Sequence, residues 1–264
     1  MIRRREFLAL LKSLAFVLGY LAAGLCAGWA CASRGAVSAT VLTDVLVIAL
    51  CGTYYFHSVR PDDLSVRAGL ARVSAGTRLA FGAGLIVIWM VLQASAAVAG
   101  AYVRDPLMEA YNAKAASGSV GAGLLLSLVL APVSEELLHR GTVMACLRDR
   151  YGPLPGIVLS SFVFAALHGT FTHLYTAFFF GIVLGILYET TRNLAYCVAC
   201  HSACNFVSMV ISGTGLTVSA ATVAGLAALN VLFVIAVVER LVELQDAYRR
   251  TRSGTGMAGG AGVG

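Results

Sequence analysis

The chain has 264 residues, of which 59% are hydrophobic and only 12% are charged, and its mean hydropathy is +0.83. A soluble domain carries about 25% charged residues, so a water-soluble fold is excluded and lipid is the solvent that suits this composition. The net charge of +6 comes from basic residues scattered in short loops. This pattern sets membrane orientation and does not form a nucleic-acid-binding face.

Eight apolar segments are candidates for membrane-spanning helices, each of which needs about 20 mostly apolar residues. The predicted spans are residues 13–32, 37–56, 79–102, 119–147, 155–169, 173–189, 194–212 and 216–239. The first exceeds the roughly 7–15 apolar residues of a signal peptide, so we expect an uncleaved helix. The sequence predicts an all-α polytopic membrane protein, a bundle of about eight transmembrane helices. We expect a single domain over residues 1–252 and a flexible Gly-rich tail over residues 253–264.

The orientation follows from the distribution of basic residues. With the N-terminus in the cytoplasm, the inside segments hold 14 arginines, and the outside loops hold Arg34, Arg104 and Lys114. Basic residues are enriched in cytoplasmic loops, so this asymmetry predicts cytoplasmic N- and C-termini. The basic loops and small size suit a bacterial inner membrane.

Ionisable residues inside a membrane are costly and tend to face the bundle interior, where they have a function. The fourth span contains Glu135, Glu136, His139 and Arg140. Glu136 and Arg140 are four residues apart and share a helix face, which allows an ion pair. Glu135 points about 100° away from Glu136, so we expect it to be the freer carboxylate. The sequence does not assign a role to His139.

Two further spans contribute polar residues. The fifth contains Phe164 and His168, and the seventh contains His201 and Asn205 on one helix face. At about 1.5 Å per residue, Glu135, His168 and Asn205 each lie roughly 20 Å from the cytoplasmic side, and His201 lies roughly 14 Å from it. We therefore expect three helices to bring these side chains to a similar depth.

The ordered motifs Glu-Glu-x-x-x-Arg, Phe-x-x-x-His and His-x-x-x-Asn on separate spans resemble those of the CPBP family. This family comprises CAAX-processing proteases and bacteriocin-processing or bacteriocin-immunity proteins, and the resemblance covers about residues 119–210. It implies an intramembrane endopeptidase with Glu135 and His168 as the catalytic pair. Glu136, Arg140, His201 and Asn205 would complete the site.

Two chemistries are open at such a site. Glu135 can act as general base for a water molecule, with His168 holding the water and with His201 and Asn205 donating hydrogen bonds to the oxyanion. Alternatively, Glu135, His168 and His201 would bind Zn²⁺ and leave one position for water. The family is often labelled metalloprotease. We favour the metal-free mechanism because it gives Asn205 a role.

Three functions remain open. The first is an intramembrane protease that cuts a membrane-associated peptide or protein, CAAX-type or bacteriocin-like, reaching it from the cytoplasmic side. The second is a non-catalytic immunity or scaffold protein of the same family. The third is a transporter whose buried acids and histidines relay protons.

Overall fold

The computed structural model describes residues 4–59, 74–102, 106, 120–212 and 220–258. Within these ranges the chain is helical and contains no strand. The helices are α1 (Arg4–Ala30), α2 (Ala36–Tyr54) with the π-helical extension η1 (Tyr55–Val59), α4 (Ala75–Tyr102), α9 (Pro153–Leu167), α10 (Phe171–Thr191), α11 (Leu194–Ser212) and α12 (Ala220–Ala258). One further continuous helix consists of α6 (Val120–Leu125), η2 (Leu126–Leu130), α7 (Ala131–Glu136), η3 (Leu137–Met144) and α8 (Ala145–Tyr151).

The prediction of an all-α membrane protein is confirmed. Each of the eight predicted spans overlaps a helix of the described ranges, and residue 119 of the fourth span and residues 216–219 of the eighth lie outside those ranges. Four described segments are long and apolar enough to cross a membrane, namely Arg4–Ala30, Ala36–Val59, Val120–Tyr151 and His173–Thr191. Pro153–Leu167 and Leu194–Val210 are shorter apolar helices. Large apolar side chains such as Leu25 and Trp29 are exposed on the outside of the bundle, where lipid accommodates them.

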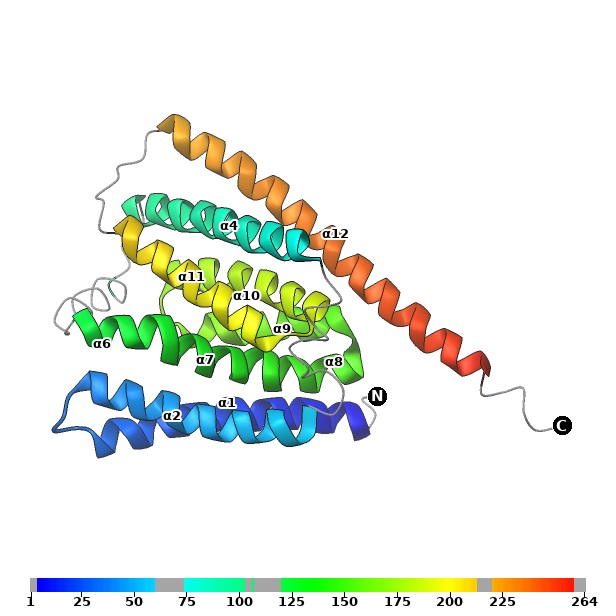
Figure 1. The fold of residues 1–264 in the computed structure, drawn as a ribbon, viewed down its shortest axis with the longest axis horizontal. Coiled ribbons are helices and arrows are strands. Elements are labelled where there is room, and N and C mark those ends of the chain that lie inside the picture. The colour runs from blue at the N-terminus through cyan, green and yellow to red at the C-terminus, as the bar shows by residue number, and fades with distance from the viewer. Residues whose placement is uncertain (1–3, 60–73, 103–105, 107–119, 213–219, 259–264) are drawn as a thin grey trace.

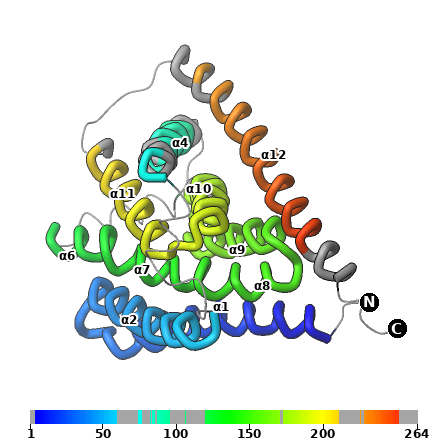
Figure 2. Tube along the Cα trace, turned by 45° about the vertical axis from the view of Figure 1, so that its right-hand side comes forward, coloured from blue at the N-terminus to red at the C-terminus, as the bar shows by residue number. Residues whose placement is uncertain are grey.

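The helices form layers around the α6–α8 helix (Figure 1). α1 and α2 pack together on one side of this helix, and α9, α10 and α11 lie on the other side. α4 packs on α10, α11 and α12, so α4 and α12 form the outermost layer (Figure 2). The α6–α8 helix is thereby enclosed by its neighbours, and its segment from Glu136 to Leu147 is buried.

The ion pairs place several of the predicted cytoplasmic arginines at the end of the bundle where α8 ends. Glu189 near the end of α10 accepts from Arg148 Nε at 2.7 Å and from Arg192 at 2.5 Å. Arg34 lies in the turn between α1 and α2, at the opposite end. Arg104 and Lys114 lie outside the described residues, so the comparison at the outer end rests on Arg34.

The turn after α8 is fixed by a glycine and by the last helix. Gly152 has φ of 93°, a left-handed conformation that favours glycine, and Pro153 begins α9. Gln245 of α12 accepts from the Leu154 backbone N–H at 3.1 Å and donates to the Tyr151 carbonyl at 3.2 Å. α12 therefore extends past its predicted end and holds this turn. It continues through residues 253–258, which were expected to be flexible, and residues 259–264 lie outside the described part.

Gly181 and Gly185 let α10 approach α9 closely, as small residues at this spacing often do in membranes. A Cβ atom added to Gly181 would lie 2.9 Å from Ser161 Cβ, and one added to Gly185 would lie 2.8 Å from Ile157 Cγ2. Packing, and not a chemical role, explains this motif.

Replacing Gly181 by alanine is expected to lower the free energy of unfolding by about 1–3 kcal/mol, because overpacking forces the two helices apart. The measurement is thermal unfolding of the purified protein in detergent. Gly28→Ala in α1 is the control, since its added Cβ meets nothing within 4 Å. Equal unfolding temperatures for the two variants would contradict the close approach.

Candidate active site

The candidate site is a cavity of about 250 Å³ between α4, the α6–α7 segment, α9, α10 and α11. Four of the six predicted site residues line it: Glu135, His168, His201 and Asn205. The other two, Glu136 and Arg140, lie behind its wall and are fully buried. The motifs on three separate helices therefore meet in one place.

The two adjacent glutamates have different environments, as their helical spacing predicts. Arg140 donates to Glu136 Oε1 at 2.8 Å, and neither side chain is more than 1% exposed. The Glu135 side chain is 25% exposed, and its Oε2 atom lies 3.7 Å from His201 Nε2. Glu135 is therefore the carboxylate that can meet a substrate or water in the cavity.

Arg140 connects three helices. It also donates to the Gly181 carbonyl of α10 at 2.8 Å, and its guanidinium lies 5.1 Å from the ring centroid of Phe164 in α9. Arg140 thus fixes α9 and α10 against the helix that carries Glu135.

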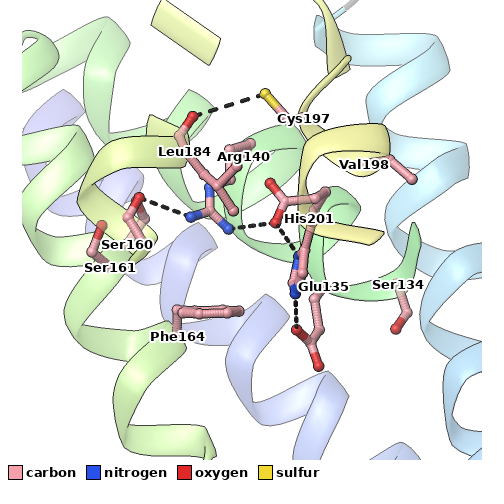
Figure 3. A network of polar contacts seen from close by, with 12 residues as sticks. Ser134, Glu135, Arg140, Ser160, Ser161, Phe164, Leu184, Cys197, Val198 and His201 are labelled. Carbon is pink, nitrogen blue, oxygen red and sulfur yellow. Dashed lines mark hydrogen bonds and ion pairs between the residues drawn. The ribbon is translucent and has the colours of Figure 1, made fainter. Parts of the chain in front are cut away.

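His201 lies between the two glutamates (Figure 3). Its Nδ1 atom is 2.9 Å from Glu136 Oε1. Because the Glu136 carboxylate accepts this bond, Nδ1 carries the proton and Nε2 faces Glu135. His201 can donate a hydrogen bond from Nε2 to a substrate only as an imidazolium.

His168 caps the C-terminus of α9, and its Nδ1 atom is 2.8 Å from the Phe164 carbonyl. A carbonyl oxygen only accepts, so Nδ1 carries the proton and the neutral ring accepts at Nε2. The two residues are one helical turn apart, and their rings also contact each other edge-on with centroids 4.7 Å apart. His168 is suited to hold a water molecule or to take a proton.

Asn205 donates a hydrogen bond to a backbone carbonyl that lacks a donor from its own helix. In the η2 segment, the Ala131 N–H donates to the Leu126 carbonyl, five residues earlier. The next donor in this register would be Pro132, which has no N–H, and Asn205 Nδ2 donates to the Ser127 carbonyl at 2.9 Å instead. One amide hydrogen of Asn205 is used in this bond and the second is available.

The two π-helical segments flank the glutamates. π-helical turns are rare and are frequently found at functional sites. Here η2 frees the Ser127 carbonyl for Asn205, and η3 contains Arg140 and the buried His139. The ring of His139 packs edge-on against Phe164 at 5.0 Å and does not line the cavity.

Several residues that line the cavity were not predicted from the sequence. Trp89 donates to Ser208 Oγ at 2.6 Å and Gln93 donates to the same atom at 3.2 Å, which joins α4 to α11 at the cavity wall. His173, at the start of α10, has its ring 5.9 Å from that of His168. Gln93 is a polar residue inside an apolar run. This was the one feature of the sequence that could have indicated the cavity wall formed by α4.

Asp44 of α2 links two helices. Ser134 Oγ donates to Asp44 Oδ1 at 2.8 Å, across 90 positions of sequence. Asp44 and Ser134 are both buried. This bond holds α2 against α7 directly beside Glu135.

The zinc-dependent mechanism requires three ligand side chains that lie close enough together to bind one metal ion. Among the described residues, no three His, Cys, Asp or Glu side chains are grouped closely enough to hold one metal ion. His201 and Glu135 are close, but His168 is not grouped with them. The residues present do not fit the predicted zinc site, and a metalloprotease assignment has no support in their arrangement.

A carboxylate, two imidazoles and an amide around one cavity in an all-α membrane bundle make this cavity the candidate functional site. Residues 118–207, about a third of the chain, match the family model described as type II CAAX prenyl endopeptidase Rce1-like. These residues are similar to the Rce1-like family, whose members are intramembrane proteases, and the similarity supports an enzyme of that class. No curated protein and no solved structure matches the chain. The resemblance predicted over residues 119–210 is confirmed.

Proposed function

We propose that this intramembrane endopeptidase hydrolyses peptide bonds with a water molecule that Glu135 activates. The observation that carries the proposal is the contrast between the two glutamates. Glu136 is 0% exposed and paired with Arg140, whereas the 25% exposed Glu135 faces the cavity beside His201. A general base must reach the proton that it removes, and Glu135 is the carboxylate that can do so.

Groups that line the cavity can carry out the proton transfers of this reaction. Glu135 removes a proton from water while the oxygen attacks the peptide carbonyl carbon, and His168 Nε2 orients that water. The tetrahedral intermediate then collapses, the C–N bond breaks, and the proton passes from Glu135 to the leaving amine. Glu135 returns to its ionised state, and the products are an amine and a carboxylic acid, which carries the second proton of the water and ionises after release.

Asn205 and the protonated form of His201 supply hydrogen bonds to the oxyanion in this mechanism. The available amide hydrogen of Asn205 suits this role, since its other hydrogen is fixed to the Ser127 carbonyl. Preorganised donors of this kind are effective because they need no reorientation during the reaction.

Removal of one such donor lowers kcat by about 10²- to 10³-fold, and we expect this loss for Asn205→Ala. The measurement is kcat and KM for one cleaved peptide. Asn230→Ala in α12 is the control, because Asn230 lies outside the cavity. A change confined to KM would remove Asn205 from the oxyanion role.

The substrate is a membrane-associated peptide or protein, of CAAX or bacteriocin-like type, and the enzyme lies in a bacterial inner membrane with cytoplasmic termini. The support for this orientation is the cluster of Arg148, Arg192 and Glu189 at the end of α8. The sequence predicts access from the cytoplasmic side.

The test is a cleavage screen of a peptide library with purified protein in detergent, read by mass spectrometry. We expect internal cleavage that persists when a chelator is added. Loss of cleavage with chelator and its recovery with zinc would favour the metal alternative. Proton-driven flux through liposomes without cleavage would favour a transporter, and a phenotype that survives Glu135→Gln would favour an immunity or scaffold protein.

A further inference from the structure

α4 forms one wall of the candidate active site although it lies outside the segment that is similar to known intramembrane proteases. That segment covers residues 118–207. Trp89 and Gln93 of α4 line the cavity, and so does Ser208, which follows the segment on α11. The similarity therefore assigns no role to these three residues.

The orientation of the Gln93 side-chain amide follows from the hydrogen bonds of Ser208. The Ser208 hydroxyl donates its single proton to the Cys204 carbonyl at 3.1 Å, so its oxygen can only accept from other partners. It accepts from Trp89 Nε1 at 2.6 Å and from Gln93 Nε2 at 3.2 Å. The amide nitrogen of Gln93 therefore faces Ser208, and its Oε1 atom lies on the other side of the amide.

The connection between α4 and α11 does not require a glutamine at position 93. The shorter bond from Trp89 to Ser208 already joins the two helices. Gln93 uses one of its two N–H donors in its bond to Ser208, and among the described residues no donor bonds to its Oε1 atom. Polar residues inside a membrane are costly, and their groups tend to serve a function. One acceptor and one donor of Gln93 are therefore left for a molecule in the cavity.

The remaining groups of the Gln93 amide are complementary to a peptide group. Each peptide group of a substrate presents one N–H donor and one C=O acceptor. Hydrogen bonds to the main chain of an extended peptide supply affinity, and they do not depend on the side chains of that peptide. The chemistry of Gln93 thus favours the substrate backbone as its ligand.

The position of Gln93 relates this contact to the oxyanion donor Asn205. Asn205 and Ser208 are three residues apart on α11, so they share a helix face and are about 4.5 Å apart along the helix axis. Residues of an extended peptide are about 3.3 Å apart. A peptide that runs along α11 with its scissile carbonyl at Asn205 consequently has another peptide group, one or two residues away, beside the amide that Ser208 holds.

We infer that Gln93 forms hydrogen bonds with the substrate main chain one or two residues from the scissile bond. This contact positions the scissile bond at Glu135 and Asn205. The inference rests on the proposed protease function and specifies its substrate class, which is a peptide segment bound in an extended conformation through its backbone. Gln93 acts in substrate binding and takes no part in proton transfer.

The test combines a variant of the enzyme with a change in the substrate. Peptides of one cleaved sequence carry an ester in place of a single peptide N–H, at each position within two residues of the scissile bond, which itself remains a peptide bond. The value of kcat/KM is measured for each peptide with the wild-type protein and with Gln93→Met, which keeps the length of the side chain and removes the amide. Gln93→Asn, whose amide is one methylene shorter, is the second variant if Gln93→Met does not fold. Ser95→Ala is the control on α4, because Ser95 does not line the cavity.

For the wild-type protein and Ser95→Ala, we expect the ester at one position to lower kcat/KM by about 2- to 10-fold, the effect of losing one neutral hydrogen bond. For Gln93→Met, we expect a similar loss with the unmodified peptide and no further loss with that ester. Equal effects of the ester on wild-type protein and Gln93→Met at every position would overturn the inference and leave the protease function intact. A wild-type protein that cleaves no peptide would contradict the proposed function, and the inference with it.

Discussion

Replacing Arg140 by methionine is expected to lower the free energy of unfolding by about 3–5 kcal/mol, because breaking a buried pair leaves an uncompensated buried charge. The charge is that of Glu136, which is 0% exposed. The Gly181 carbonyl also loses its donor. The measurement is thermal unfolding in detergent, where this loss gives a decrease of several degrees.

Two variants isolate the cause of that loss. Arg150→Ala removes an exposed arginine near the same end of the helix and is expected to leave the unfolding temperature unchanged. The double variant Glu136→Leu with Arg140→Met removes both charges and is expected to recover part of the lost stability. If the double variant were less stable than Arg140→Met alone, uncompensated charge would not be the reason.

Replacing His168 by alanine is expected to lower kcat by about 10²- to 10⁴-fold, the usual contribution of a residue that transfers or orients a proton. Its Nδ1 proton is fixed by the Phe164 carbonyl, so the ring presents Nε2 to the cavity. Alanine removes this acceptor. The measurement is kcat and KM for a cleaved peptide together with the unfolding temperature.

His57→Ala is the matched control for His168, because His57 is exposed on η1 and does not line the cavity. It is expected to retain full activity. An unchanged kcat for a folded His168→Ala variant would remove His168 from the mechanism and leave Glu135 without its partner.

The parts of the fold that depend on one helix at a time could be predicted from the sequence. Hydropathy located the helices, since lipid requires long apolar runs. The Glu136–Arg140 pair could be predicted because residues four apart share a face. The separation of Glu135 from that pair follows from the same geometry.

Contacts between helices could not be derived in this way. The bonds of His201 to Glu136 and of Asn205 to the Ser127 carbonyl depend on how α11 packs against the α6–α8 helix. The role of Trp89 and Gln93 at the cavity wall likewise depends on the position of α4. Periodicity along one chain contains no information on these interhelical distances.

In the proposed mechanism, Glu135 activates the water that cleaves the peptide bond. The most direct measurement is the initial rate of cleavage of one confirmed peptide by purified Glu135→Gln, which keeps the size of the side chain and removes the base. We expect a rate at least about 10²-fold below that of the wild-type protein, with an unchanged unfolding temperature and with wild-type activity that persists in chelator. A folded Glu135→Gln variant that cleaves at the wild-type rate would contradict this mechanism.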